Sequence, residues 1–155
     1  MTEPRTSQET GFRVDAIFLP LQHCETVDKS APGISLAADD QVRIGWDWAW
    51  LEVGTSFEVA VSIDREPSEA RPEVVRLKAV ARFTLSGRST SVTVEEFALR
   101  NAPAMLVPYL RQAFHALTGN GPFGAQLLQP INVVAAMERF DPKKSTAAKQ
   151  SLAAP

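Results

Sequence analysis

Three tryptophans, Trp46, Trp48 and Trp50, stand on alternate positions of one short segment, and this spacing limits what the chain can fold into. Val42 and Ile44 extend the same row, while small or charged residues fill the positions between. Successive side chains of a β-strand point to opposite faces, so the segment predicts a strand with one bulky apolar face. That face is either core or a surface that binds polypeptides, because aromatic side chains dominate both.

Three other segments alternate in the same way and predict three more strands. They span residues 12–18, 57–63 and 75–85. Pro20 interrupts the first of them, and the polar, turn-rich stretch 25–40 predicts a long crossing loop. The charged, proline-containing stretch 65–72 predicts a hairpin connection.

The second half of the chain changes to helical spacing. Val92, Val94 and Phe97 still suggest a short strand or extended piece. Residues 101–119 then repeat apolar side chains every three or four positions, which predicts a long helix with Asn101 as its N-cap. Gly119-Asn120-Gly121 supplies the stop, and a second helix is expected over 132–140. Strands followed by helices predict an antiparallel α+β domain.

Composition excludes several classes of protein. The chain has 155 residues, enough for one domain, and a net charge of -2 without a basic stripe, so no nucleic-acid partner is expected. Cys24 is the only cysteine, which excludes an internal disulfide and favours a reducing, cytoplasmic compartment. No apolar run resembles a secretory signal or reaches the length of a membrane span, so no membrane insertion is expected.

The candidate catalytic groups do not form a motif. His23 and Cys24 are neighbours, but neighbouring strand residues point to opposite faces. The acidic pairs 39–40 and 95–96 are expected to be solvated, and His115 is expected at a surface or interface. A phosphate loop, a dinucleotide fingerprint and a zinc motif are all missing. We therefore predict a protein that is not an enzyme and has no cofactor and no metal.

The predicted apolar faces exceed what a domain of this size can bury. One strand face with three tryptophans, two further apolar strands and two amphipathic helices compete for one small core. Oligomerisation and polypeptide binding are the two natural uses of the remaining surface, and they are compatible.

One region resembles a known family. The stretch 101–140 carries Pro108-Tyr109 in the long helix, the turn Gly121-Pro122-Phe123, and Leu128, Pro130 and Asn132 ahead of an apolar segment with Ala136 and Met137. In these features the chain resembles the SecB family of bacterial protein-export chaperones. The resemblance extends over about residues 12–141, which leaves 1–11 and 142–155 as expected disordered ends.

The resemblance implies a fold, an assembly and site residues. The implied fold is a four-stranded antiparallel sheet with a long helix and a second C-terminal helix packed on one side, assembled as a homotetramer, a dimer of dimers. The implied client-binding residues are Ile34, Leu36, Trp46, Trp48, Trp50, Phe123, Val133, Met137 and Phe140. The implied oligomer interface consists of Phe12, Val14, Leu106, Leu110, Phe114 and His115.

The implied function is that of an ATP-independent holdase for unfolded or precursor polypeptides, acting in protein export. Two features depart from the family, in which acidic surfaces engage the SecA motor. The strand around Arg76 and Lys78 looks basic, and the tail 143–149 is basic as well. The alternatives are a SecB-like chaperone dedicated to a toxin-antitoxin pair, with the antitoxin as partner, and a non-catalytic self-assembling subunit.

Overall fold

The four alternating segments form one antiparallel sheet. The computed structural model describes residues 11–39, 41–86, 92–130 and 132. The strands are β1 (Phe12–Thr26), β2 (Val42–Glu52), β3 (Ser56–Arg65) and β4 (Glu73–Leu85). Their order across the sheet is β1-β4-β3-β2, so β1 and β2 are the two edges. The predicted antiparallel α+β architecture is confirmed.

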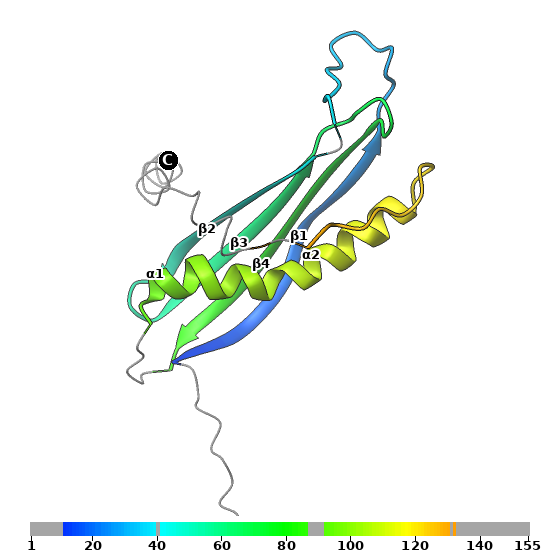
Figure 1. The fold of residues 1–155 in the computed structure, drawn as a ribbon. Coiled ribbons are helices and arrows are strands. Elements are labelled where there is room, and N and C mark those ends of the chain that lie inside the picture. Colours follow the sequence, from blue (N-terminus) through cyan, green and yellow to red (C-terminus); the bar gives the residue numbers. More distant parts are fainter. Residues whose placement is uncertain (1–10, 40, 87–91, 131, 133–155) are drawn as a thin grey trace, which may run out of the picture.

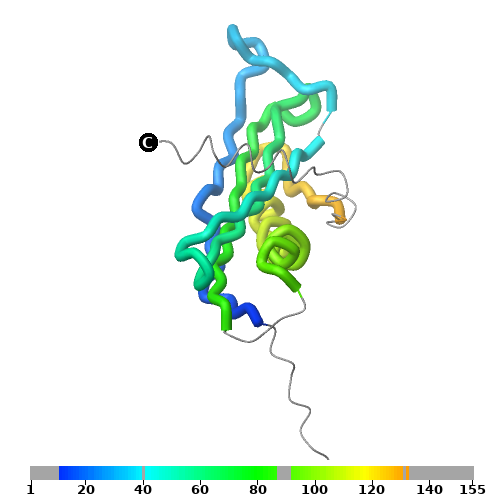
Figure 2. Tube along the Cα trace, turned by 90° about the vertical axis from the view of Figure 1, so that its left-hand side faces the viewer, coloured from blue at the N-terminus to red at the C-terminus, as the bar shows by residue number. Residues whose placement is uncertain are grey.

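The helical part follows the sheet and covers one of its faces (Figures 1 and 2). It consists of α1 (Val94–Glu96), the π-helical η1 (Phe97–Asn101) and α2 (Ala102–Gly119). The buried face of α2 carries Leu106, Leu110 and Phe114, the apolar stripe that the sequence predicts. These side chains pack on the inward rows of β3 and β4, which include Phe57, Ile63, Leu77 and Phe83.

The predicted short strand at Val92–Phe97 is wrong, because this segment starts the helix. Thr93 and Glu96 form a reciprocal capping box: the Thr93 hydroxyl accepts from the Glu96 N–H at 3.1 Å, and the Glu96 carboxylate accepts from the Thr93 N–H at 3.2 Å. Asn101 lies inside the helical run and makes no side-chain capping bond, so its predicted N-cap role is also wrong. The stop at Gly119 is confirmed.

Pro20 does not end the first strand. β1 continues through it to Thr26, with register shifts between Val14 and Ala16 and between Phe18 and Leu21. An edge strand tolerates proline because the missing N–H can lie on the unpaired side. The first strand is therefore much longer than predicted.

The crossing loop connects the two edge strands and projects past one end of the sheet (Figure 1). It is tied to the β3–β4 hairpin, because the Val27 N–H donates to the Pro72 carbonyl at 2.8 Å and the Ala37 N–H to the Pro67 carbonyl at 2.7 Å. Lys29 and Glu69 add an exposed ion pair at 2.9 Å. The predicted loop and hairpin connection are confirmed, and these bonds, which the sequence did not predict, join them at one end of the molecule.

The predicted second helix, 132–140, and the predicted disordered ends, 1–11 and 142–155, lie outside the described residues apart from Gly11 and Asn132. Within the described part of the chain, no helix is both long and apolar enough to cross a bilayer.

The capping box makes a direct prediction. Thr93→Ala should lower the free energy of unfolding by about 1 kcal/mol, because it leaves the first turn of the helical run without its side-chain acceptor. Urea denaturation followed by circular dichroism measures this loss. Glu95→Gln is the matched control, since Glu95 is exposed and outside the box. An equal loss in both variants would contradict the assigned role of Thr93.

Candidate functional site

The tryptophan row lies on the face of the sheet that α2 covers. Trp46, Trp48 and Trp50 pair across the strands with Val61, Val59 and Phe57 of β3, which are almost completely buried. The tryptophans themselves, and Ile44 beside them, are only half-buried. We call Ile44, Trp46, Trp48 and Trp50 the tryptophan strip.

The strip stays half-exposed because β2 is an edge strand. α2 packs mainly against β4, β3 and β1, and it is η1 that reaches β2. One side of the strip joins an aromatic cluster: the rings of Trp48 and Trp50 lie 6.1 Å and 5.9 Å from that of Phe57, both edge to face. One side of the strip therefore belongs to the core, and the rest of it is exposed.

Other apolar side chains are exposed near the ends of the sheet. Of the predicted client-binding residues on the crossing loop, Ile34 is exposed and Leu36 is half-buried. Sequence reasoning missed Leu51 and Val53, which are 53% and 82% exposed at the end of β2. Leu51 lies at a register irregularity of β2 between Trp50 and Glu52, so alternation does not place it, and only its position next to a turn could have pointed to it.

The segment after α2 folds back along the helix (Figure 1). We call residues 121–128 the exit segment. Phe123, a predicted client-binding residue, is 37% exposed, and Leu127, which the sequence analysis missed, is 67% exposed. Gln126, which precedes Leu127, turns its side chain inward to Arg65. Leu128, which follows Leu127, joins the core and is 5% exposed. The exit segment thus presents two apolar side chains from an anchored backbone.

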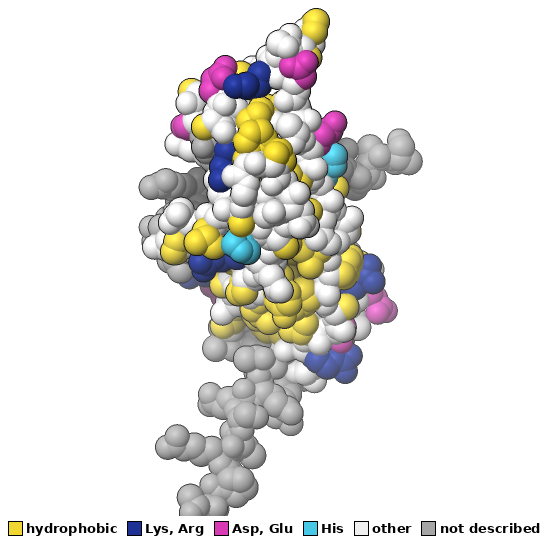
Figure 3. Space-filling view, turned by 90° about the vertical axis from the view of Figure 1, so that its right-hand side faces the viewer, with side chains coloured by type: hydrophobic (Ala, Val, Ile, Leu, Met, Phe, Trp, Pro, Cys, Tyr) yellow, Lys and Arg dark blue, Asp and Glu magenta, His cyan; other side chains and the backbone are white. Residues whose placement is uncertain are grey.

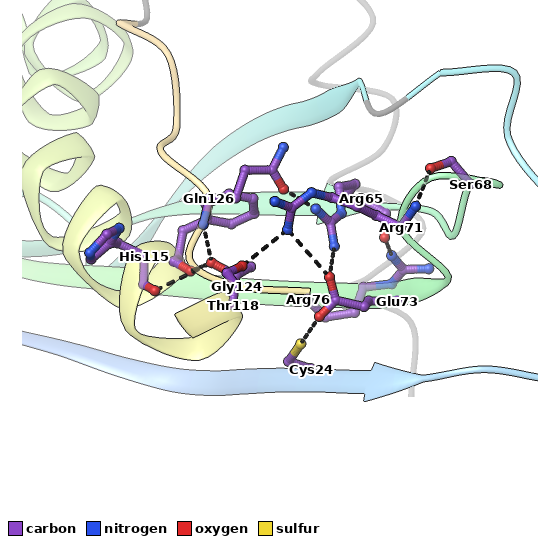
Figure 4. A network of polar contacts seen from close by, with 11 residues as sticks. Cys24, Arg65, Ser68, Arg71, Glu73, Arg76, His115, Thr118, Gly124 and Gln126 are labelled. Carbon is purple, nitrogen blue, oxygen red and sulfur yellow. Dashed lines mark hydrogen bonds and ion pairs between the residues drawn. The ribbon is translucent and has the colours of Figure 1, made fainter. Parts of the chain in front are cut away.

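A buried polar network lies beneath the exit segment (Figure 4). Arg65 at the end of β3 and Glu73 at the start of β4 form an ion pair at 2.9 Å, and both side chains are fully buried. The Arg65 guanidinium also donates to the Gln126 side-chain oxygen. Cys24 on β1 donates its thiol to the other Glu73 oxygen at 3.6 Å. Burial, and then the Glu73 carboxylate, raises the pKa of the Cys24 thiol.

Four of the predicted interface residues occupy the chain's own core. Leu106, Leu110 and Phe114 are completely buried, and Phe12 is 9% exposed. Their surface is already covered by the sheet and the helix of the same chain, which corrects the expectation that they face a second subunit. The apolar stripe of α2 is the side of the helix that faces the sheet of the same chain.

Two interface predictions remain open to a partner, because Val14 on β1 and His115 on α2 are exposed. Figure 3 looks onto the side of the molecule that carries the β1 edge, where hydrophobic side chains gather and charged ones lie mostly around them. Met105 and Tyr109, one helical turn apart on α2, are also exposed. These exposed side chains belong to β1 and α2, whereas the tryptophan strip belongs to β2.

The sequence predicts a basic surface on the outer face of the sheet, but this face carries charges of both signs. Arg76 pairs with Asp64 at 3.3 Å and with Glu66 at 2.7 Å. Arg82 pairs with Glu58 at 2.9 Å. Both of these arginines have acidic neighbours, while Lys78, the other residue of the predicted basic surface, is exposed, so the surface carries charges of both signs. The basic tail lies outside the described residues.

The chemically reactive side chains point apart. His23 contacts Glu25 at 3.2 Å on the exposed side, whereas Cys24 contacts Glu73, so the two do not pair. Among the described residues, no group of three or more histidine, cysteine, aspartate or glutamate side chains could hold a metal ion. Val133, Met137 and Phe140, three predicted client-binding residues, lie outside the described residues.

Comparison with solved structures shows where this fold occurs. A SecB-like chaperone of Mycobacterium tuberculosis, solved in complex with a ChAD peptide from the HigA1 antitoxin, matches with a TM-score of 0.60 at 18% identity. The match covers 78% of this chain and 91% of that one. At this identity the likeness establishes the fold, so the chain has the fold of a SecB-like chaperone.

A protein of unknown function from Streptococcus agalactiae aligns less well, with a TM-score of 0.46 at 11% identity, over 77% of this chain and 97% of that one. No protein-family model and no curated protein sequence matches the chain.

Proposed function

We propose that this protein is an ATP-independent holdase that binds unfolded polypeptides along the tryptophan strip. The observation that carries the proposal is the half-burial of Trp46, Trp48 and Trp50 on an edge strand. Aromatic side chains that are anchored on one side and exposed on the other are typical of binding hot spots. The SecB-like fold supports the same function.

The chemistry of the strip suits many clients. Indole rings bind apolar side chains through area and shape, with few directional bonds, so they accept varied sequences. Preferential binding to the unfolded state shifts a client's folding equilibrium by mass action, which requires no nucleotide. Phe123 and Leu127 of the exit segment, and Ile34 and Leu36 of the crossing loop, offer further exposed apolar area.

A role dedicated to one toxin-antitoxin pair is the second candidate. The similar chaperone of Mycobacterium tuberculosis was solved with a peptide from an antitoxin, which supports it. The mixed charge of the outer sheet face supports it too, because the family resemblance implies acidic surfaces for the SecA motor. A dedicated chaperone should bind one antitoxin far more tightly than unrelated unfolded chains.

We further propose a homotetramer that uses the apolar surface at the β1 edge. Val14 and His115, with Met105 and Tyr109, offer exposed area for it. If self-association instead consumed the tryptophan strip, the protein would be a self-assembling subunit only. Light scattering after size exclusion determines the mass, and an environment-sensitive apolar dye then tests whether the assembled protein still exposes apolar surface.

The experiment that tests the holdase proposal is the dilution of a guanidinium-denatured client into buffer with and without this protein. Light scattering should rise with the client alone and stay low when the protein is present, without ATP. An equal mass of an inert folded protein controls for crowding. An unchanged rise in scattering for several unrelated clients and for an antitoxin would contradict both candidate functions.

A further inference from the structure

Arg65 and Glu73 are fully buried charged side chains, and their presence needs a reason. Removing both charges from water is so unfavourable that an apolar pair of similar volume often stabilises a protein equally well or better. The Nε of Arg65 is buried without a hydrogen-bond partner among the described residues, which adds to the desolvation penalty. Stability of the fold alone therefore does not explain the pair.

The contacts of the pair converge on one feature, the exit segment (Figure 4). Arg65 donates to the side chain of Gln126. Arg71 lies 3.7 Å from Glu73 Oε1, the oxygen that also pairs with Arg65, and it donates to the Gly124 carbonyl at 3.2 Å. The ion pair thus reaches the exit segment at two points, one of them through Arg71.

The end of α2 supplies two further anchors. The Thr118 hydroxyl accepts from the Gln126 N–H at 2.9 Å and itself donates to the Phe114 carbonyl at 2.8 Å. The Gly121 N–H donates to the Thr118 carbonyl at 3.1 Å. Because the side chain of Gln126 is held inward, the next residue, Leu127, is left to face outward.

At Gly121 the backbone of the exit segment comes very close to the Glu73 carboxylate. A Cβ at this position would lie 2.8 Å from Glu73 Oε2, nearer than side-chain carbons come to such atoms. Gly121 does not have a positive φ, so its backbone would accept alanine. Glycine is therefore required here because the backbone lies close to Glu73, and not because of its φ angle.

We propose that Arg65 and Glu73 are positioning residues that hold the exit segment in place and so present Phe123 and Leu127 to a client. This inference rests on the proposed function, since it assigns a role within the same binding surface. Buried polar groups can fix one conformation at the expense of stability, and here the conformation fixed is that of a recognition segment.

The test uses the full-length double variant Arg65→Met/Glu73→Leu. Apolar replacement should leave the urea midpoint unchanged or raise it. Amide hydrogen exchange at Gln126 and Gly121 should nevertheless accelerate by about ten-fold or more. The variant removes the bond from Arg65 to the Gln126 side chain and the carboxylate that pairs with Arg71, so of these anchors only Thr118 is left untouched. Binding of a denatured client, measured by fluorescence anisotropy, should weaken by about five- to ten-fold. Val80→Ala, a change at a buried side chain on the opposite face of the sheet from both the network and the tryptophan strip, is the control for general loosening and should leave client affinity unchanged.

A second variant keeps the inference testable if the double variant does not fold. Gly121→Ala retains both charges and should lift the exit segment from Glu73, again with faster exchange and weaker binding. In the background Phe123→Ser/Leu127→Ser, neither network variant should weaken client binding further, because the presented side chains are already absent.

Two results would overturn the inference. Unchanged exchange at Gln126 would mean that the network does not hold the segment, and unchanged client affinity despite faster exchange would mean that its position does not serve binding. Failure of the proposed function is distinguishable from both, because in that case the wild-type protein itself would not bind the denatured client.

Discussion

The double variant Trp48→Gln/Trp50→Gln is expected to bind a denatured client about 30-fold more weakly than the wild type. Both indoles are half-buried, so each combines a fixed position with exposed apolar area. Such side chains lose little conformational entropy when a partner binds, which is why truncating them is costly. Fluorescence anisotropy of a labelled denatured client, titrated with either protein, measures the difference.

The control for this variant comes from the opposite face of the same strand. Ala49→Gln changes an exposed side chain that lies between Trp48 and Trp50 in the regular ladder and so points away from the strip. We expect its client affinity to match the wild type. If Ala49→Gln weakened binding as much as the tryptophan variant, the client would not distinguish the faces and the strip would not be the site.

Replacing Phe57 by alanine is expected to lower the free energy of unfolding by about 3–5 kcal/mol. The ring is completely buried and stacks on Phe83 with centroids 5.2 Å apart. It also supports Trp48 and Trp50 edge to face. Truncation leaves a cavity at the point where the core and the strip meet, and urea denaturation measures the loss.

Phe57→Leu separates the two roles of this ring. It keeps most of the buried volume, so the stability loss should be clearly smaller than for alanine. Client affinity should fall with Phe57→Ala more than with Phe57→Leu, because the indoles lose their support. A loss of stability below about 1 kcal/mol for Phe57→Ala would contradict the packing described.

Much of the sheet could be predicted because a period of two is a strong signal. The tryptophan row and the inward rows of β3 and β4 follow from alternation, and the buried face of α2 follows from helical spacing. What periodicity cannot tell is which neighbour covers an apolar face. For that reason Leu106, Leu110 and Phe114 were predicted at a subunit interface although the chain's own sheet buries them.

Two local signals were present and missed. Thr93 followed by Glu96 is the spacing of a capping box, and it outweighs the β-forming tendency of Val92 and Val94. Arg65 continues the inward row of β3 after Ile63, and Glu73 precedes Val75 on the inward row of β4. Opposite charges on inward positions at two facing strand ends indicate a buried ion pair, whereas the predicted hairpin connection 65–72 counted Arg65 among its charges and left Glu73 out.

The exit segment shows what sequence patterns leave undetermined. Leu127 is exposed because Gln126 and Leu128 on either side of it are held inward by contacts with distant residues. These contacts depend on how the end of α2 meets the β3–β4 hairpin. A list of apolar residues can therefore nominate Phe123 but cannot tell that Leu127 faces outward.

Site-specific photo-crosslinking tests the central claim most directly. p-Benzoylphenylalanine in place of Trp50 or, in a second protein, in place of Ala49 puts the same reactive group on opposite faces of β2, because both positions lie in the regular part of the ladder with β3. Irradiation with a denatured client should give a crosslinked product from position 50 and little or none from position 49. Equal capture at both positions, or capture at position 49 alone, would contradict binding of unfolded chains along the tryptophan strip.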